Sequence, residues 1–545
     1  MLYQNAKRVV ILLCLIFSLL ACDAKKTGVA IAEPLVVQTE SGLVKGKLVG
    51  TKAQPITAFL GIPYAQAPVA ELRWQPPQAV STWQDTRDTT HFSNDCLQIP
   101  FPGDAAPLGE PVSEDCLYLN VWTPKIQGDT KLPVMVWIHG GGFVNGGGSP
   151  AVYNGQKFAE SGVVFVSFNY RLGRFGFFAH PALSEENPDS PLGNYGFMDQ
   201  IAALKWVKNN IKQFGGDENN VTLFGESAGG RSVNVMMLSP QAKGLFHKAI
   251  MQSGGGRSNS IGSVVYLDKP NKEGKPSAEQ VGVTFAKSVG IESEGQSALA
   301  ELRALPAEKV LSDLNMATMN SPTYSGPIID GKVVVEDDET GFKAGHQVAI
   351  PIFIGSNDFE WGFLKDFNAI GAAMIAEKTL AEATNQETFL AAYQPFVPMK
   401  DEQLDRAFLG SMIFGDRSFL EPARFIARQT SANGQATWFY RFTYVPTSLE
   451  GKVDGAYHAS EIPFVFGTGE ARYADAFSEA DKQLSEVMHE AWVNFAKAGN
   501  PSLEKTRFPQ FKPNDEKLIE FNSHGVVIKN DPLAGRLDQI SRLAQ

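Results

Sequence analysis

Residues 221–230, Val-Thr-Leu-Phe-Gly-Glu-Ser-Ala-Gly-Gly, constrain the fold of this chain more than any other stretch. The first four are apolar or β-branched and predict a short buried strand, and apolar residues at helical spacing follow in residues 231–237. The residues between match G-x-S-x-G, the pattern of a nucleophile elbow, in which a sharp turn from strand to helix exposes the hydroxyl of Ser227. The outer glycines lack Cβ atoms, so the two elements can approach closely. The N–H group of Ala228 then points towards the place where negative charge develops during attack on a carbonyl.

The same pentapeptide also occurs as an ordinary turn, because a short motif is a hypothesis until its context agrees. A catalytic serine needs a base, an acid that orients the base, and donors that bind an oxyanion. The catalytic interpretation therefore requires these three parts elsewhere in the chain.

A glycine-rich loop upstream of the serine offers the donors. Residues 132–138 form a nearly continuous apolar run, typical of a strand that helices cover on both faces, and His-Gly-Gly-Gly-Phe follows at 139–143. Consecutive glycines at the end of a buried strand leave backbone N–H groups free to converge on one point. We therefore expect Gly141 and Gly142 to form an oxyanion hole with Ala228. The alternative is a merely flexible loop, which a second glycine run shortly afterwards favours.

The elements around the motif predict an α/β fold with a large, mostly parallel central sheet flanked by helices. Strand-like runs are found at residues 163–169, 221–224, 247–252, 350–354 and 436–444. They alternate with segments of helical periodicity such as residues 194–211, and this alternation builds a parallel sheet through right-handed crossovers. We expect helical insertions that cap the active site, among them one helix at residues 380–393 and another at 401–408.

Eight histidines are available as the base, and the order of the catalytic residues narrows the choice. In the α/β-hydrolase order the acid and the histidine follow the serine, which leaves His346, His458 and His524, since His489 lies within a predicted helix. His458 lies in a loop just after the last long strand, from which it can reach the exposed serine. A neutral imidazole there can take the serine proton and return it to the leaving group.

The acid should follow a strand that lies between the serine and the histidine in the chain. Residues 350–354 are such a strand, and Asp358 and Glu360 follow it within a few residues. Either carboxylate could orient the ring of His458 and stabilise the imidazolium. Spacing alone does not choose between them.

Several motifs together resemble the type-B carboxylesterase family, which includes cholinesterases and bacterial para-nitrobenzyl esterases. The resemblance covers about residues 35–540. The motifs are the His-Gly-Gly-Gly-Phe loop, Phe-Gly-Glu-Ser-Ala-Gly-Gly at 224–230, Glu-Asp-Cys-Leu-Tyr-Leu-Asn at 114–120, Gly-Asn-Tyr-Gly at 193–196 with Asp199-Gln200, and Glu-Ile-Pro-Phe at 461–464. The resemblance implies an α/β-hydrolase fold and a carboxylic-ester hydrolase that forms an acyl-enzyme on small to medium esters.

The resemblance also implies roles for individual residues. It implies a triad of Ser227, Glu360 and His458, because the family's Gly-x-Asn-x-x-Glu segment matches residues 355–360. It further implies structural ion pairs of Arg73 with Glu114 and of Arg171 with Asp199.

Two of the four cysteines, Cys96 and Cys116, enclose a short loop outside the N-terminal segment. In an exported chain such a pair predicts a disulfide, and the family resemblance implies the same bond. Metal binding is the alternative, but no histidine or second cysteine pair stands at ligand spacing. We therefore expect no metal and no cofactor.

Two departures from the family pattern concern the substrate. The loop between Cys96 and Cys116 has no tryptophan, whereas cholinesterases place there an aromatic side chain that holds a quaternary ammonium, so choline esters are not expected substrates. The family usually has a small residue at the position of Arg231. A charge there would either contact a substrate carboxylate or pair with an acidic residue, and the pairing is favoured because most such charges are structural.

Two other functions stay open. A binding protein of the same fold is one, since some relatives lack the triad, but the presence of all three triad residues favours an enzyme. The other keeps the chemistry and changes the substrate to an amide, a thioester or a long-chain lipid. The pockets that decide this are built by loops whose contacts spacing does not predict.

The first 22 residues have the features of an export signal. Two basic residues precede an apolar run at residues 9–20, which is too short to span a bilayer as a helix. Leu-Leu-Ala-Cys at 19–22 resembles a bacterial lipobox, in which Cys22 receives a lipid. We expect a signal peptide at residues 1–21, a flexible tether at 22–34 and a single catalytic domain at 35–545. The protein would then be periplasmic or held on a membrane by lipidated Cys22; an ordinary signal peptide and secretion are the alternative.

The balance of charges limits the partners. With 59 acidic and 48 basic residues, the 545-residue chain has a formal net charge of −11. An acidic surface without a basic cluster argues against nucleic acid and against electrostatic binding to anionic lipid. We expect a small-molecule ester as the substrate and no nucleic-acid partner.

Overall fold

The computed structural model describes residues 35–51, 53–101, 103–124, 131–258 and 264–544. The predictions of a signal peptide, a tether and lipidated Cys22 fall on residues 1–34 and lie outside the described residues. Residues 36–545 form one compact unit. Within the described ranges, no helix is long and apolar enough to cross a membrane.

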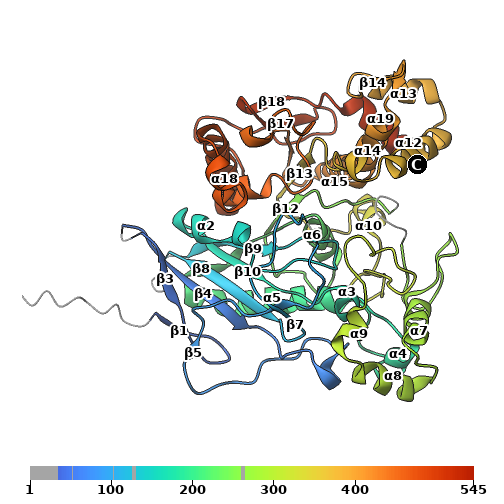
Figure 1. Cartoon of the computed structure of the whole chain (residues 1–545). Helices are drawn as coiled ribbons and strands as arrows, with labels where there is room; N and C mark the ends of the chain where they lie inside the picture. Colours follow the sequence, from blue (N-terminus) through green and yellow to red (C-terminus); the bar gives the residue numbers. More distant parts are fainter. Residues whose placement is uncertain (1–34, 52, 102, 125–130, 259–263, 545) are drawn as a thin grey trace, which may run out of the picture. The chain divides into compact units, whose positions relative to one another are not determined.

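A sheet of 11 strands runs through this unit (Figure 1). In spatial order the strands are β18 (Gly525–Asn530), β17 (Lys517–Asn522), β16 (Thr437–Phe442), β13 (Ile352–Asn357), β12 (Lys248–Gln252), β11 (Gly216–Glu226), β9 (Leu132–Ile138), β10 (Val164–Phe168), β8 (Tyr118–Thr123), β4 (Pro55–Pro63) and β3 (Lys47–Gly50). Neighbours from β17 to β10 are parallel, whereas the pairs at the two edges are antiparallel. The predicted α/β fold with a mostly parallel sheet is confirmed.

Helices and short strands complete the unit. The helices are α2 (Gln156–Glu160), α3 (Gly173–Gly176), α4 (Pro181–Glu186), α5 (Tyr195–Asn210), α6 (Ala228–Leu238), α7 (Ala278–Ser288), α8 (Gly295–Ala304), α9 (Ala307–Leu311), α10 (Asp338–Ala344), α11 (Leu364–Phe367), α12 (Ala369–Glu382), α13 (Gln386–Tyr393), α14 (Arg406–Gly415), α15 (Glu421–Ala432), α16 (Ile462–Phe466), α17 (Gly469–Tyr473), α18 (Glu479–Ala498) and α19 (Ala534–Leu543). The short strands are β1 (Val36–Gln38), β2 (Leu43–Lys45), β5 (Arg87–Asp88), β6 (Asp95–Cys96), β7 (Val112–Ser113), β14 (Met399–Lys400) and β15 (Gln403–Leu404). A π-helical turn, η4 (Asp416–Leu420), joins α14 to α15.

The sheet has a hydrophobic core on each face. In β9, Val134 and Val136 belong to one core while Met135 and Trp137 belong to the other. Side chains of α5, α6 and α15 pack into the first core, and those of α2, α16 and α18 into the second. Because both faces are covered, a central strand such as β9 is apolar along its length, as the run at 132–138 predicted.

Two predicted helices differ from the structure. The helix expected at residues 380–393 is two helices, because the side chain of Asn385 accepts the Thr388 N–H and starts α13 anew. The helix expected at 401–408 begins later, after the β14–β15 hairpin, where Asp405 caps the first turn of α14. In both places an Asn or Asp side chain begins the helix by satisfying otherwise unpaired N–H groups.

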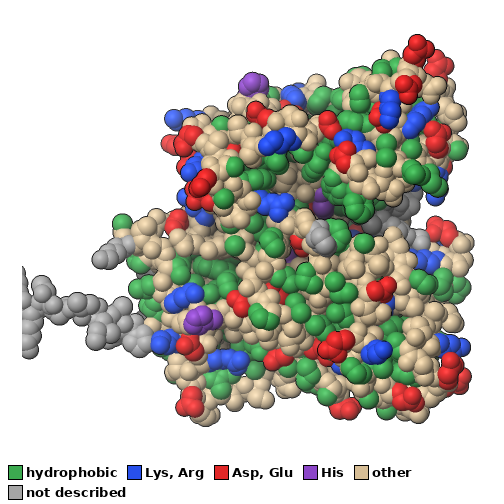
Figure 2. Space-filling view, viewed as in Figure 1, with side chains coloured by type: hydrophobic (Ala, Val, Ile, Leu, Met, Phe, Trp, Pro, Cys, Tyr) green, Lys and Arg blue, Asp and Glu red, His purple; other side chains and the backbone are tan. Residues whose placement is uncertain are grey.

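The parallel strands bring distant segments of the chain together. The residues that follow β9, β11, β13 and β16 all emerge at the same edge of the sheet, since the carboxyl ends of parallel strands point one way. On the face shown in Figure 2, Lys and Arg side chains are interspersed with Asp and Glu. The segments that carry the predicted catalytic residues thus meet at the carboxyl edge of the sheet.

Candidate active site

Ser227 occupies the turn between β11 and α6. Its backbone has φ 55° and ψ −122°, a left-handed conformation that costs a residue with a Cβ on the order of 1–3 kcal/mol. The Ser227 N–H donates to the carbonyl oxygen of Gln252 at 2.9 Å, which fixes the turn against the end of β12. This is the strand, turn and helix that the motif predicted.

The glycines around Ser227 are required because the backbone of α6 lies very close to the backbones of the neighbouring strands. A Cβ on Gly229 would overlap the carbonyl oxygen of Ile138 in β9, and one on Gly225 would come within 2.5 Å of the Gly229 carbonyl carbon. A Cβ on Gly230 would lie 2.7 Å from the Gln252 carbonyl oxygen. Helix α6 therefore meets the sheet without side chains between them.

The glycine loop after β9 lies beside this turn. A Cβ built on Gly140 would lie 3.1 Å from the Cβ of Ser227. Gly141 and Gly142 have φ of 102° and 62°, so both adopt conformations that favour glycine. Within the described part of the chain, the N–H groups of Gly141, Gly142 and Ala228 donate to no protein acceptor. Three free donors thus flank the serine.

Other left-handed residues gather at this edge. Besides Ser227, the non-glycine residues Phe143, Ser253 and Ala459 have φ of 63°, 49° and 64°. They follow the glycine loop, β12 and His458, which are the segments that meet here. Backbone strain concentrated in this way is typical of a functional site.

Glu360 and His458 form a close pair. Glu360 Oε2 lies 2.6 Å from His458 Nδ1, and the His458 N–H donates to the Glu360 carbonyl oxygen at 2.9 Å. The other carboxylate oxygen, Oε1, accepts the Ser253 hydroxyl at 2.6 Å and the Asn357 N–H at 2.7 Å. The fully buried carboxylate is therefore held from three sides, and it fixes the orientation of the imidazole.

The alternative acid and bases lie elsewhere. Asp358 accepts the N–H of Ala456 at 2.8 Å, and it is not among the carboxylates that act on His458. His346 is 59% exposed and pairs with Glu336 at 2.7 Å. The backbone N–H of His524 donates to Asn522 in the β17–β18 turn. Of the candidates, only Glu360 and His458 are brought together.

The second nitrogen of the imidazole faces another acid. His458 Nε2 lies 3.2 Å from Glu226 Oε1, on the residue that precedes the serine. Across the described residues, the Ser227 hydroxyl has no hydrogen bond to His458. Hydrogen bonds between catalytic groups are often long in unliganded enzymes and shorten when substrate binds.

Three carboxylates surround the imidazole and control its charge. Burial disfavours the imidazolium, but Glu226, Glu360 and Glu461 outweigh it and raise the pKa of His458 to about 9. Burial also raises the pKa of Glu226 above its usual range. The Glu226–His458 pair therefore titrates as a coupled unit.

Aromatic side chains hold the imidazole from its faces. The ring of Phe419, in the π-helical turn η4, stacks on His458 with centroids 4.6 Å apart, and Trp361 stacks at 6.0 Å. On the oxyanion side, a Cβ on Gly142 would approach Met316 Sδ to 2.8 Å, so a methionine covers the glycine loop. Apolar side chains thus cover the faces of the imidazole and the glycine loop.

A buried polar network supports the site from below. Glu461 accepts from Gln252 at 3.0 Å and from Asn357 at 2.8 Å, and Gln252 also accepts from the Trp492 indole at 3.0 Å. Sequence reasoning assigned Glu461 only to a family motif and missed the roles of Gln252, Asn357 and Ser253. Their common signal was a polar residue at the carboxyl end of a predicted strand or within three residues beyond it.

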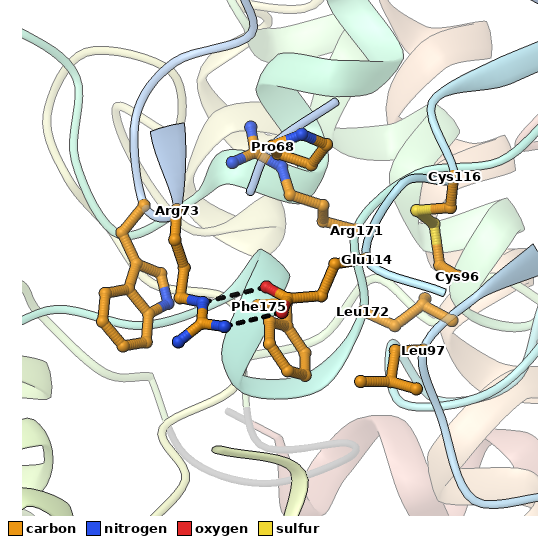
Figure 3. A pocket seen from close by; sticks show the side chains of 10 residues that line it. Pro68, Arg73, Cys96, Leu97, Glu114, Cys116, Arg171, Leu172 and Phe175 are labelled. Carbon is orange, nitrogen blue, oxygen red and sulfur yellow. Dashed lines mark hydrogen bonds and ion pairs between the residues drawn. A yellow bond between two sulfur atoms is a disulfide. The ribbon is translucent and has the colours of Figure 1, made fainter. Parts of the chain in front are cut away.

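The structure contains the predicted disulfide. Cys96 and Cys116 are bonded and buried. Figure 3 shows the bond beside a pocket that Arg73 and Leu172 also line. This cavity has a volume of only about 10 Å³, enough for roughly one water molecule, so it does not hold an organic substrate.

Both ion pairs that the resemblance implied are present. Arg73 binds the carboxylate of Glu114 through two hydrogen bonds of 2.6 and 2.8 Å (Figure 3). Arg171 binds Asp199 in the same bidentate manner at 2.7 and 2.8 Å. All four side chains are buried or nearly so, and these pairs are part of the scaffold.

Arg231 differs from these arginines. The sequence favoured pairing with an acidic residue, and this residue is Asp338, whose Oδ2 lies 3.8 Å from Arg231 Nε. The Arg231 side chain is 40% exposed. Within the described ranges, its guanidinium makes no hydrogen bond. The pairing is therefore loose.

Comparison with known proteins places the chain in a family. The model of the carboxylesterase family matches residues 33–539. Fumonisin B1 esterase of Sphingopyxis macrogoltabida is 34% identical over 500 residues, which cover 90% of this chain and 86% of that protein. Para-nitrobenzyl esterase of Bacillus subtilis is 36% identical over 512 residues, covering 91% and 96%. Cholinesterase of Mus musculus is 32% identical over 526 residues, covering 90% and 84%.

A match over this length, together with the fold, confirms the resemblance to the carboxylesterase family that the sequence motifs indicated. The protein belongs to the type-B carboxylesterase family and is an ester hydrolase.

Proposed function

We propose that this chain hydrolyses small to medium carboxylic esters with Ser227 as nucleophile, His458 as general base and Glu360 as the residue that orients the base. The observation that carries the proposal is the 2.6 Å contact of Glu360 with His458 Nδ1, at the same sheet edge as the strained turn of Ser227.

In the first half of the reaction, His458 Nε2 takes the Ser227 proton as the serine oxygen attacks the ester carbonyl. The N–H groups of Gly141, Gly142 and Ala228 stabilise the negative charge on the carbonyl oxygen. The imidazolium, stabilised by Glu360, then gives the proton to the leaving alcohol. An acyl-enzyme on Ser227 remains.

In the second half, a water molecule takes the place of the alcohol. His458 removes a proton from this water as it attacks the acyl carbonyl, and the same three donors stabilise the second oxyanion. Collapse of the intermediate returns the proton to Ser227 and releases the acid. The residues of this chain supply every proton transfer in the cycle.

The transfer needs a neutral imidazole that can reach the serine. Since Nε2 faces Glu226 at 3.2 Å, the ring must exchange this contact for the Ser227 hydroxyl. Ionised Glu226 favours the imidazolium and raises the pKa of His458, so this contact must break before the neutral ring can accept the serine proton. Glu226 thus adjusts the charge of the base.

Replacement of the nucleophile tests the mechanism. Ser227→Ala should abolish hydrolysis of a para-nitrophenyl ester, and the wild-type enzyme should show a burst of nitrophenol equal to the enzyme concentration when deacylation is slow. Rapid acid quenching followed by peptide mass analysis should find the acyl group on Ser227. Turnover by Ser227→Ala, or an acyl group on another residue, would reject the mechanism.

A long-chain ester is a second candidate substrate, favoured by one feature. Phe363 lies against Trp361 with ring centroids 5.3 Å apart, and beyond it Phe367, Ile370 and Met374 are 81%, 77% and 67% exposed. These three exposed residues follow Trp361 in the chain, in α11 and the first half of α12. Hydrolysis rates on para-nitrophenyl esters of increasing acyl length test this candidate. A maximum rate at long acyl chains would show that long-chain esters, and not small to medium ones, are the substrate class.

We further propose that the protein is exported and lipidated on Cys22, which the N-terminal sequence alone supports. Labelling of cells with palmitate should mark the wild-type chain and leave Cys22→Ser unlabelled. Equal labelling of the two chains, or none of either, would favour an ordinary signal peptide.

A further inference from the structure

Arg231 lies one helical turn beyond the nucleophile. Its backbone N–H donates to the Ser227 carbonyl oxygen at 2.9 Å, so the two residues stand in an i, i+4 relation at the start of α6. Side chains of a helix lean towards its N-terminus and cover the preceding turn. An arginine side chain at this position can therefore reach back over the turn that carries Ser227.

Most acidic residues near Arg231 are bound to other side chains. Asp337, the N-cap of α10, accepts hydrogen bonds from the hydroxyls of Ser258 and Thr340. Glu339 is bound by Arg257 and by Lys343. Asp338 also has a side-chain hydrogen bond with Asn234 of α6. Its separation of 3.8 Å from Arg231 is too long for a charge-assisted hydrogen bond.

The scaffold arginines show what a structural pair looks like in this protein. The side chains of Arg73 and Arg171 are 6% and 3% exposed, and each binds its carboxylate through two short hydrogen bonds. Arg231 is 40% exposed and has no such bond among the described residues. Its planar fork of donors is available to another carboxylate.

From this geometry we infer that Arg231 binds a carboxylate of the substrate, so that the enzyme prefers esters with a free carboxylate a few bonds from the scissile carbonyl. The inference rests on the proposed function, because the distance is counted from Ser227 as nucleophile. Positions i and i+4 of a helix are about 5–6 Å apart at Cβ, which an arginine side chain spans. Because carboxylates surround the base, an anionic substrate needs a cation beside it to offset their repulsion.

Two matched esters test the inference. The probes are n-butyl hydrogen glutarate, which carries a free carboxylate on its acyl chain, and the neutral n-butyl pentanoate. The kcat/KM ratio of glutarate to pentanoate ester should fall about tenfold to a hundredfold in Arg231→Gln, chiefly through a higher KM for the acid. Arg231→Lys should restore part of the ratio, because the charge remains without the bidentate fork.

Arg406 offers a matched control, because it is 34% exposed and also has a loose ion pair, 3.3 Å from Glu377. Arg406→Gln should leave the ratio unchanged. An unchanged ratio in Arg231→Gln would overturn the inference, as would an equal fall in Arg406→Gln.

Variants of Asp338 distinguish substrate binding by Arg231 from a purely structural role of Arg231. If Arg231 served only to neutralise Asp338, the double variant Arg231→Gln with Asp338→Asn would regain the wild-type ratio. We expect the double variant to stay as low as Arg231→Gln, and Asp338→Asn alone to keep or raise the ratio by freeing the guanidinium. Failure of the proposed function has a different signature, since Ser227→Ala would then still hydrolyse the pentanoate ester.

Discussion

The ring of Phe419 stacks on the imidazole of His458, with centroids 4.6 Å apart and planes inclined by only 13°. Phe419 belongs to the π-helical turn η4, where the helical ladder between α14 and α15 is widened by one residue. Such turns occur often at functional sites. Here the widening brings an aromatic face against the proposed base, on the side that its hydrogen bond to Glu360 does not constrain.

Phe419→Leu should therefore reduce kcat/KM for a neutral ester by up to roughly tenfold, since an aromatic pair contributes about 0.5–1.5 kcal/mol beyond its buried area. Phe414→Leu is the control, because Phe414 packs on Trp361 at 5.0 Å instead of on the imidazole. Steady-state kinetics at the pH optimum measure both. Equal losses in the two variants would mean that the stacking on His458 does not matter.

The identity of the acid gives a second prediction. Glu360→Gln should lower kcat by about 10³- to 10⁴-fold, because the amide cannot stabilise the imidazolium or fix the tautomer. Asp358→Asn should cost far less activity, since among the described residues the Asp358 side chain accepts the Ala456 N–H and has no hydrogen bond to His458. Single-turnover rates on one ester compare the two, and the reverse ranking would reassign the acid to Asp358.

Much of the fold follows from local patterns in the chain. Strand β9 has the bounds of its apolar run, because burial on both faces removes any polar position. Helix starts were predicted less well. The break before α13 lies in a run of polar residues at 384–388, where Asn385 caps the new helix.

The site could be predicted where chemistry and chain order coincide. The Gly-x-Ser-x-Gly turn fixed Ser227, and the order of elements left few histidines besides His458. Spacing could not separate Asp358 from Glu360, because the direction of each side chain depends on contacts with the segment around Ala456. The contact of Phe419 with His458 could not be predicted for the same reason, since it arises from the packing of η4.

The charges around the base predict the pH dependence. Activity requires neutral His458, and a raised pKa keeps the ring protonated to higher pH, so the acid limb of kcat/KM should have its midpoint above the usual 6.5 and towards 9. Glu226→Gln removes a carboxylate that raises this pKa and should move the midpoint to lower pH. A neutral ester keeps the substrate from titrating.

Glu470→Gln is the control for this profile, because Glu470 is 73% exposed and pairs with Lys482. Its midpoint should equal that of the wild type. A midpoint that Glu226→Gln leaves in place would show that Glu226 is neutral throughout the range and does not set the pKa of His458.

Two glycines at equivalent helix positions predict opposite effects on stability. Gly229 is the second residue of α6 and Gly535 the second residue of α19, and each follows an alanine. A Cβ at Gly229 would overlap the Ile138 carbonyl oxygen, whereas one at Gly535 would meet nothing within 4 Å. Gly229→Ala should lower the free energy of unfolding by about 1–3 kcal/mol through overpacking, and Gly535→Ala should raise it by up to about 1 kcal/mol through helix propensity. Urea denaturation followed by circular dichroism measures both, and a neutral Gly229→Ala would mean that α6 can move away from β9 without cost.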